Sequence, residues 1–414
     1  MRLRLLLVLV WLLLAAGCAS TRTAPPPAAR VDPVVLVSID GFRPDYLDRG
    51  ATPTLNALAA AGVRAKAMKP AFPSLTFPNH YTLVTGLYPD HHGIVNNRMT
   101  DPVSGARFVY NDPKTTSDPA WWGGEPIWVG AQKHGLRAAT VFWPGSDVAI
   151  AGTRPSRWLP FDGNMKPDAR VDQLLAWMDL PETERATFYT LYFEQVDHAA
   201  HEDGPDSAAV GEALREVDAA LARLVDGLKR RGLDGRVNLV IVSDHGGTAT
   251  APERVIYLED LVGEDLAERV TFGILAGLNP RPGRTADVEA RLLKKHEHMQ
   301  CARKSQMPAH LHYGTHPRIP ALLCLADDGW IITTREYLAK RKRFPGGDHG
   351  YDNDDPNMRA LFIAHGPAFK RGLVVPEFDN VDVYPLLARL LGIAPQPNDG
   401  DIAAVAPMLK AGAR

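Results

Sequence analysis

The sequence lacks an excess of basic residues. It carries 46 Lys and Arg against 48 Asp and Glu, a formal net charge of -2 over 414 residues. Nucleic-acid-binding proteins bind the phosphate backbone mainly through a strong positive electrostatic field. We therefore expect no stable binding of long DNA or RNA, and only short nucleotides remain open as substrates. Internal repeats and long low-complexity segments are also missing. With 45% apolar residues, the chain is long enough for one large α/β domain or two smaller ones.

The N-terminal apolar run is too short to cross a membrane as a helix. Arg2 and Arg4 precede this run, which extends over Leu5–Ala16, whereas a bilayer needs about 20 apolar residues. A basic start followed by a short apolar stretch is typical of a secretory signal. The segment ends in Leu-Ala-Ala-Gly-Cys, which resembles a bacterial lipoprotein cleavage site with Cys18 as the lipidated residue. Ordinary signal cleavage without a lipid is the alternative.

Cysteine is scarce, with three residues in the whole chain. Lipidation of Cys18 leaves Cys301 and Cys324, and an export signal implies an oxidising compartment, which favours a disulfide over two free thiols. We expect an exported lipoprotein of the bacterial cell envelope, anchored to the membrane by its lipid and facing the periplasm or the outside. Residues 1–17 would be the signal peptide, and residues 18–32, rich in Ala and Pro, the lipid anchor and flexible tether.

Apolar runs that alternate with helical patterns predict the fold. Runs of strand type without polar alternation suit parallel strands that are covered on both faces. Strands alternating with helices indicate a doubly wound, mostly parallel sheet with helices on both faces. In such sheets ligands bind beyond the carboxyl ends of the strands. The strand-type runs are residues 34–39, 138–142, 187–193, 238–242 and 360–364, and the clearest helical patterns are residues 54–61, 208–230 and 381–391.

One stretch breaks this alternation. Residues 253–344 are richer in Pro, His, Lys and Arg and contain both remaining cysteines. We expect a small insertion or cap on the sheet, not a separate domain, within one catalytic domain over residues 33–412. The histidines of this stretch could suggest a further metal site, but polar loops of the insertion are the favoured interpretation. They are His296, His298, His310, His312 and His316.

Seven residues of metal-ligand type are scattered along the chain. Asp197 and His201 are four positions apart, so on a helix both lie on one face and can hold one ion. Asp244 and His245 directly follow a strand-type run, where a charged pair must be solvated, paired or metal-bound. Carboxylates, imidazoles and one hydroxyl are ligands suited to two zinc ions. The full set is Asp40, Thr76, Asp197, His201, Asp244, His245 and His349.

Thr76 is predicted to lie near the N-terminus of a helix. Turn residues precede it, and an apolar pattern with Tyr81, Leu83 and Val84 follows. Free backbone N–H groups and the helix dipole at such a position favour anions. A nearby zinc ion would lower the pKa of the hydroxyl and make threonine a usable nucleophile. The alternative is that Thr76 only caps the helix.

These motifs together resemble the nucleotide pyrophosphatase/phosphodiesterase family of the alkaline phosphatase superfamily, from about Val34 to Leu391. The resemblance implies the alkaline phosphatase-like three-layer fold. No single motif is decisive, but all of them occur in the order of the family. They are Ser38-Ile39-Asp40-Gly41, Pro73-Ser74-Leu75-Thr76-Phe77-Pro78-Asn79-His80, Gly86-Leu87-Tyr88-Pro89, His92-Gly93-Ile94-Val95-Asn96-Asn97, Trp143-Pro144-Gly145-Ser146, Asp197 with His201, Ser243-Asp244-His245-Gly246 and Gly347-Asp348-His349-Gly350.

The resemblance implies two zinc ions per chain and a covalent mechanism. Thr76 would attack phosphorus at one metal and form a phosphothreonine, and water would then release the product. The Asn97 side chain and the Phe77 backbone N–H would bind a phosphate oxygen, like an oxyanion hole. One ion would be held by Asp197, His201 and His349, and the other by Asp40, Asp244 and His245 with Thr76.

Two aromatic residues suggest nucleotide substrates. Phe77 follows the nucleophile at a position where related enzymes stack a nucleobase, and Trp158 could form a second wall. The alternative is that both are core aromatics. We expect hydrolysis of nucleotide pyrophosphates and 5′-nucleotide diesters to nucleoside 5′-monophosphates. No oligomeric state is predicted.

Other activities on the same fold stay open. A phosphomonoesterase, a phosphonate hydrolase or a lysophospholipid phosphodiesterase could use the same two-zinc centre. A sulfatase is disfavoured because Thr76 does not begin a Cys/Ser-x-Pro-x-Arg motif. Two hypotheses from other functional classes are a phosphoryl transferase and a non-catalytic binding module. The complete ligand set argues against the binding module.

Overall fold

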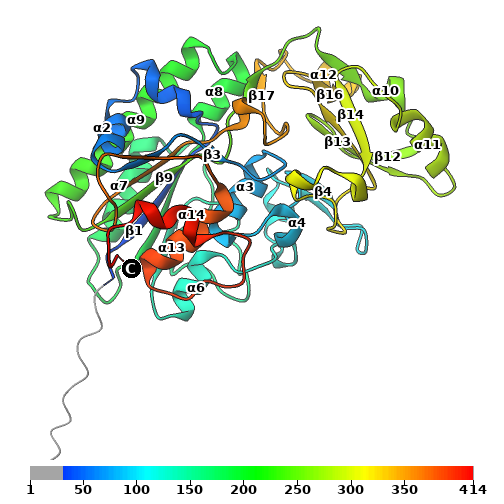
Figure 1. Ribbon diagram of the computed structural model, residues 1–414. Coiled ribbons are helices and arrows are strands. Elements are labelled where there is room, and N and C mark those ends of the chain that lie inside the picture. Colours follow the sequence, from blue (N-terminus) through cyan, green and yellow to red (C-terminus); the bar gives the residue numbers. More distant parts are fainter. Residues whose placement is uncertain (1–30, 414) are drawn as a thin grey trace, which may run out of the picture. The chain divides into compact units, whose positions relative to one another are not determined.

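An eight-stranded sheet forms the centre of the protein (Figure 1). The computed structural model describes residues 31–413, so the expected signal peptide, Cys18 and most of the tether lie outside the described residues. The strand order is β19-β2-β18-β9-β1-β8-β6-β7. The strands are β1 (Val34–Ile39), β2 (Val63–Ala65), β6 (Ala138–Val141), β7 (Arg157–Leu159), β8 (Phe188–Phe193), β9 (Asn238–Val242), β18 (Phe362–His365) and β19 (Leu373–Val375).

Most of this sheet is parallel, as predicted. β9, β1, β8, β6 and β7 all run in one direction. β18 differs from the expectation in its direction. The sequence groups its apolar run with those of the parallel strands, whereas β18 is antiparallel to both β9 and β2. Its carboxyl end at His365 therefore points to the edge of the sheet opposite to the ends of β1 and β9. The residues that directly follow β18 therefore lie at the opposite edge.

Helices cover both faces of the sheet, which gives the predicted three layers (Figure 1). α9 (Ala208–Arg230) packs against α2 (Pro53–Ala61), α7 (Pro167–Met178) and α8 (Gln195–Asp203) on one face. α3 (Thr76–Thr85), α6 (Ile127–Lys133) and α13 (Val383–Leu391) pack on the other face.

The long helix α9 follows from its sequence. Ser207 accepts a hydrogen bond from the Val210 backbone N–H at 3.3 Å and so caps the first turn. Apolar residues then recur at helical spacing and meet one face of β1 in a single core. Truncation of a buried leucine in such a core costs about 2–5 kcal/mol. The buried stripe comprises Val210, Leu214, Val217, Leu221, Leu224 and Leu228.

The segment expected to be an insertion contains a second sheet. Four antiparallel strands in the order β12-β13-β15-β14 surround a separate apolar core. A short parallel pair, β11 (Val255–Tyr257) with β16 (Ile331–Thr333), lies in the same part of the chain, drawn in yellow-green to yellow in Figure 1. The strands of the second sheet are β12 (Ala267–Thr271), β13 (Leu275–Pro280), β14 (Met299–Arg303) and β15 (Leu322–Ala326).

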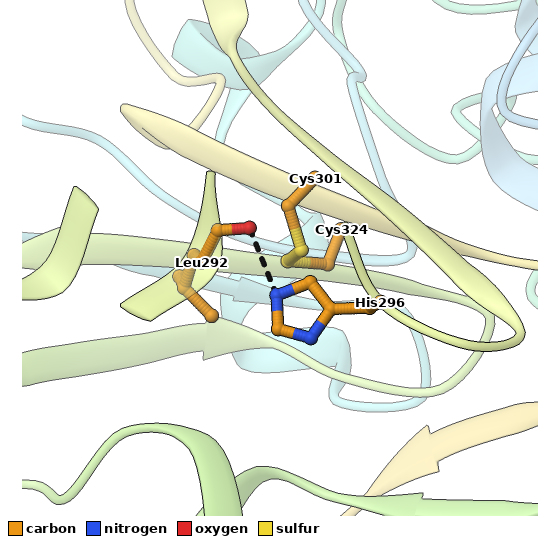
Figure 2. The surroundings of a disulfide bond; sticks show 4 residues. All are labelled: Leu292, His296, Cys301 and Cys324. Carbon is orange, nitrogen blue, oxygen red and sulfur yellow. Dashed lines mark hydrogen bonds between the residues drawn. A yellow bond between two sulfur atoms is a disulfide. The ribbon is translucent and has the colours of Figure 1, made fainter. Parts of the chain in front are cut away.

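Cys301 and Cys324 form a disulfide, as predicted (Figure 2). They are direct partners in the register between β14 and β15, so the bond joins two paired strands. Beside it, the His296 ring donates through Nε2 to the Leu292 carbonyl oxygen at 3.0 Å, at the end of α11 (Thr285–Leu292). For His296, this contact agrees with the interpretation of the histidine as a structural residue of the insertion.

Hydrogen bonds attach the second sheet region to the main fold. The Asp90 carboxylate in α4 (Pro89–His92) accepts from the backbone N–H groups of Thr315 at 2.9 Å and His316 at 2.7 Å. Among the described helices, none has the length and apolar character needed to span a membrane.

The remaining short elements are β3 (Met68–Lys69), β4 (Arg98–Thr100), β5 (Arg107–Val109), β10 (Thr248–Ala249), β17 (Gly347–Asp348), β20 (Phe378–Asp379), α5 (Pro113–Thr116), α10 (Leu258–Leu261), α12 (Arg335–Ala339) and α14 (Ile402–Val405).

Candidate metal centre and nucleophile

Three neighbouring parallel strands deliver acidic residues to one edge of the sheet. β9, β1 and β8 are adjacent, with β1 in the middle. Asp40 directly follows β1, Asp244 comes two residues after β9, and Asp197 lies in the first turn of α8 after β8. Because the carboxyl ends of parallel strands meet at the same edge, these residues converge although they are far apart in sequence.

The first ligand group is buried. Asp40, Asp244 and His245, here called the buried trio, are each at most 1% exposed. His245 Nε2 lies 3.4 Å from Asp40 Oδ1 and 3.0 Å from Asp244 Oδ2. Within the described residues, both of these carboxylate oxygens are buried without a hydrogen-bond donor. Unpaired carboxylate oxygens in the interior are costly, so this arrangement fits a bound cation.

The tautomer of His245 supports the same conclusion. Its Nδ1 lies 2.8 Å from the Gly246 carbonyl oxygen, which can only accept, so Nδ1 carries the proton. Nε2 then presents a lone pair to the two carboxylates. Three acceptors therefore face one point, and a backbone carbonyl fixes the orientation of the imidazole, as is usual for metal-binding histidines.

The second ligand group is more open. Asp197, His201 and His349, here called the open trio, have side chains that are 19%, 30% and 6% exposed. Asp197 lies 3.5 Å from His201 Nε2 and 3.7 Å from His349 Nε2, and the two Nε2 atoms are 3.1 Å apart. Nδ1 of His201 faces the Gly347 carbonyl oxygen at 3.0 Å, and Nδ1 of His349 faces that of Ser74 at 2.7 Å. Both histidines thus direct lone pairs at each other, which a cation between them would stabilise.

The two trios meet at His245. Its ring stacks on that of His349 with centroids 3.6 Å apart, and Asp197, His245 and His349 also offer ligand atoms within 4.8 Å of one another. The donor atoms in this edge of the sheet are carboxylate oxygens and imidazole nitrogens, the ligands that zinc takes in proteins. The residues present therefore fit two zinc ions.

Charge and burial shift the protonation of these groups. Burial, then the charges of Asp244 and Asp197, raises the pKa of Asp40 well above its ordinary value. Burial also acts to raise the pKa of Asp244, but His245 and His80 outweigh it and hold that pKa well below its usual range. Burial lowers the pKa of His349 to about 3, so this imidazole stays neutral at physiological pH and keeps its lone pair for a metal.

Thr76 is the first residue of α3, as predicted. Its Oγ1 lies 3.4 Å from His245 Nε2, beside the buried trio. Leu75 occupies the N-cap position and Thr76 the first helical position, so the alternative that Thr76 is merely the cap does not apply. The hydroxyl is aimed at the ligand group from a helix N-terminus, where partial positive charge favours an anion.

Asn97 contacts Phe77, the residue after Thr76, in an arrangement that differs from the expected one. Its Oδ1 accepts a hydrogen bond from the Phe77 backbone N–H at 3.0 Å. The two expected phosphate donors therefore contact each other in this structure. The Asn97 amide NH₂ remains a donor for an anion, whereas the Phe77 N–H must first exchange its partner.

Phe77 lies among aromatic rings, and Trp158 is not one of them. The rings nearest to Phe77 are those of Phe108, Tyr110 and Trp122, at centroid distances of 5.8, 5.9 and 6.3 Å. Trp158 instead lies in the edge strand β7 and its ring contacts the Arg154 guanidinium at 5.4 Å. No aromatic contact joins Trp158 to these rings among the described residues, so its role as a second wall of a base site stays a prediction. Tyr110, 41% exposed, is a further candidate for that wall.

Comparisons with known proteins agree with this geometry. Residues 34–352 match the family model of type I phosphodiesterase/nucleotide pyrophosphatase. The chain belongs to this family. It is 38% identical over 95% of its length to ectonucleotide pyrophosphatase/phosphodiesterase family member 3 of Rattus norvegicus, covering 46% of that protein. An uncharacterized pyrophosphatase/phosphodiesterase of Schizosaccharomyces pombe is 37% identical over 91% of the chain, which covers 80% of the yeast protein. The chain spans about half the length of the first of these relatives.

Solved structures of this family have the same fold. The inactive murine ectonucleotide pyrophosphatase/phosphodiesterase 5, a threonine-to-alanine variant in complex with AMP, superposes with a TM-score of 0.87 at 33% identity. The match covers 92% of this chain and all of the murine chain (100%). The human protein of the same name matches equally well, with a TM-score of 0.87 at 34% identity. The predicted alkaline phosphatase-like architecture is therefore confirmed.

Three polar residues at this site were not predicted from the sequence. Tyr192 donates its hydroxyl to Asp40 Oδ2 at 2.6 Å. His80 lies 2.9 Å through Nδ1 from the Thr76 carbonyl oxygen and 3.3 Å from Asp244 Oδ2. Asp348 adds a carboxylate 4.0 Å from His201. Tyr192 reads as an ordinary strand residue in the sequence, whereas His80 and Asp348 stand inside matched motifs and could have been singled out there.

Gly41 shows why the strand end has its particular sequence. Its φ of +67° lies in the left-handed region that glycine adopts readily. A Cβ at this position would come within 3.0 Å of the Asp197 Cα and Cβ atoms. The close approach brings α8 against the end of β1, so a larger residue would separate Asp197 from Asp40.

Proposed function

We propose that the protein hydrolyses nucleotide pyrophosphates and 5′-nucleotide phosphodiesters to nucleoside 5′-monophosphates through a phosphothreonine at Thr76. The observation that carries the proposal is the position of Thr76 Oγ1, at a helix N-terminus and 3.4 Å from His245 Nε2. The names of the relatives, and the complex of the murine homologue with AMP, support nucleotides as the substrate class.

Two zinc ions are part of the proposal. The buried trio would hold one ion and the open trio the other. When bound, zinc lowers the pKa of a nearby hydroxyl and stabilises the charge on a transferred phosphoryl group. The fit rests on the two unpartnered carboxylate oxygens of the buried trio and on three imidazoles whose protonated nitrogens face backbone carbonyls.

Residues of the chain would then carry out two displacement reactions at phosphorus. Thr76 Oγ1 loses its proton to solvent and attacks phosphorus, and the bond to the leaving group breaks as the bond to Oγ1 forms. The N-terminus of α3 and the Asn97 amide stabilise the negative charge on the phosphoryl oxygens. A water molecule next attacks phosphorus and breaks its bond to Oγ1, which recovers a proton. The products are the leaving group and a nucleoside monophosphate.

Stacking would supply the preference for nucleotides. Phe77 directly follows Thr76 and has Tyr110 as its most exposed aromatic neighbour. A base stacked on this aromatic surface would place phosphorus in line with Thr76 Oγ1. A stacked base contributes about 1–3 kcal/mol and tolerates every base. The runner-up activities, on monoesters, phosphonates or lysophospholipids, would gain nothing from this surface.

Replacement of Thr76 tests the proposal. Thr76→Ala should lower kcat/KM for a nitrophenyl nucleotide diester at least about a thousandfold, because the nucleophile is gone. Zinc content should stay at two ions, since both trios keep all their side chains. Thr76→Ser serves as the matched control and should retain partial activity. Near-normal turnover by Thr76→Ala would refute the covalent mechanism, and a higher kcat/KM for a simple aryl monoester than for the nucleotide diester would move the assignment to a phosphatase.

Export and lipid attachment are proposed as well. The disulfide between Cys301 and Cys324 is a bond that persists in oxidising compartments and is rare in the cytosol. This agrees with the N-terminal sequence pattern that ends at Cys18. Intact mass of the membrane-extracted protein should show a mature chain that begins at Cys18 and carries acyl chains. A different mature start, or no acyl mass, would refute the lipid anchor.

A further inference from the structure

The two carboxylates of the buried trio are oriented in the same way. Asp244 Oδ1 accepts a hydrogen bond from the Gly41 backbone N–H at 3.2 Å, and its Oδ2 has no hydrogen-bond donor among the described residues. Asp40 Oδ2 accepts from the Tyr192 hydroxyl at 2.6 Å, and its Oδ1 likewise has no donor in the described part of the chain. Both free oxygens lie within 3.4 Å of His245 Nε2. Each carboxylate is therefore anchored through one oxygen and offers the other.

The anchor on Asp40 is a side chain, and its own position is fixed. Tyr192 is the penultimate residue of β8, 8% exposed, and packs edge-on against His80 with ring centroids 5.2 Å apart. The Tyr192 carbonyl oxygen accepts from Arg170 Nη1 at 2.9 Å, and Arg170 is fully buried. The strand end cannot shift without breaking these contacts, so the hydroxyl is held where it meets Asp40.

We infer that Tyr192 is a positioning residue for metal binding, whose hydroxyl selects Asp40 Oδ1 as the oxygen presented to the ion. The inference rests on the proposed binding of zinc by the buried trio. Replacing Tyr192 by phenylalanine keeps the ring but leaves Asp40 Oδ2 buried without its donor, because Asp40 is the one partner of this hydroxyl within the described chain. The carboxylate is then free to rotate, and removal of such a supporting hydrogen bond typically weakens metal affinity by about 10- to 100-fold.

The test compares Tyr192→Phe with a matched control in the same strand. Tyr189 is also buried in β8, and its hydroxyl has no hydrogen-bond partner among the described residues. Both variants and the wild-type protein are equilibrated in zinc buffers that span a wide range of free zinc, and bound zinc is measured. Thermal unfolding of the metal-free proteins is recorded in parallel. Turnover of the nucleotide diester is then measured at limiting and at saturating zinc.

We expect Tyr192→Phe to release one of its two ions at about 10- to 100-fold higher free zinc than the wild type, and the other ion at an unchanged concentration. Saturating zinc should restore most of its turnover, and Tyr189→Phe should match the wild type throughout. Two ions with wild-type affinity in Tyr192→Phe would overturn this inference alone. Equal weakening of both ions, together with a lower unfolding temperature than that of Tyr189→Phe, would also overturn it, since Tyr192 would then support the fold. A wild-type protein that binds no zinc would overturn the proposed function and this inference with it.

Discussion

The two trios of ligands differ in burial, and the difference follows from the elements that carry them. The buried trio comes from the ends of β1 and β9, which are adjacent strands, and its side chains are at most 2% exposed. The open trio comes from one turn of α8 and a glycine-rich loop after β17, and His201 is 30% exposed. A sheet centre provides rigid, dry ligands, whereas a helix and a loop provide ligands that solvent can reach.

With the two proposed ions bound, this contrast would divide the tasks between them. Unpaired charges in the interior cost several kcal/mol, so the buried trio would depend strongly on a bound cation. The open trio could lose its ion and let water replace it. Thr76, the proposed nucleophile, lies against His245 of the buried trio. Changes in the buried trio should therefore affect catalysis and folding together, and changes in the open trio should affect catalysis more than folding.

The largest effect is expected from Asp244→Asn. This substitution keeps the volume but removes a charge that is 0% exposed and lies 3.0 Å from His245 Nε2. We expect one zinc ion to be lost and kcat/KM for the nucleotide diester to fall at least about a thousandfold, which corresponds to about 4 kcal/mol. Metal analysis and steady-state kinetics measure both. Retention of two ions and of substantial activity would contradict the central role of the buried trio.

A smaller effect is expected from His349→Ala. The ion of the open trio should be lost, because only two of its three ligands remain. The buried trio should keep its own ion. We expect one zinc per chain, an unfolding temperature close to that of the wild type and a fall of about a hundredfold in kcat/KM. Loss of both ions would show that the two trios form a single cooperative site and would remove the contrast between them.

The smallest effect is expected beside the metal centre, at Phe77. Phe77→Ala should lower kcat/KM for a nucleotide diester by about 1–3 kcal/mol, roughly ten- to hundredfold, because the base loses its stacking partner. A diester without a base should lose much less. Trp158→Ala, at the other predicted wall, is measured on both substrates, and no change on either would remove Trp158 from the base site. Equal losses on both substrates would mean that Phe77 positions Thr76 and does not select the base.

The fold could be predicted where one signal dominates. The apolar runs at residues 34–39 and 238–242 coincide with β1 and β9, and the helical pattern at residues 208–230 coincides with α9. Long amphipathic helices and doubly covered strands have strong periodicity. The direction of β18 could not be predicted, because a buried apolar run reads the same in parallel and antiparallel neighbours.

The site was predictable to the extent that motifs mark it. The seven ligand types could be named, and the structure brings all of them to one edge of the sheet. The role of Trp158 as a second wall stays a prediction, because no spacing rule links it to Phe77. Tyr192 was missed because its role depends on a hydroxyl that meets a residue 152 positions away in the sequence. Such long-range hydrogen bonds leave no local pattern.

The spread of the ligands along the chain has a consequence for how the two proposed ions would be acquired. His245 lies 205 positions after Asp40 (245 − 40), and His349 lies 152 positions after Asp197 (349 − 197), so the ligands of each ion meet only when distant parts of the chain have packed together. Contacts of such long sequence separation form slowly, after the entropy of closing the chain has been overcome. Each ion would therefore bind only to a nearly finished fold. Metal loading would act as the last step of maturation, and stable retention of two ions would report that the domain has folded.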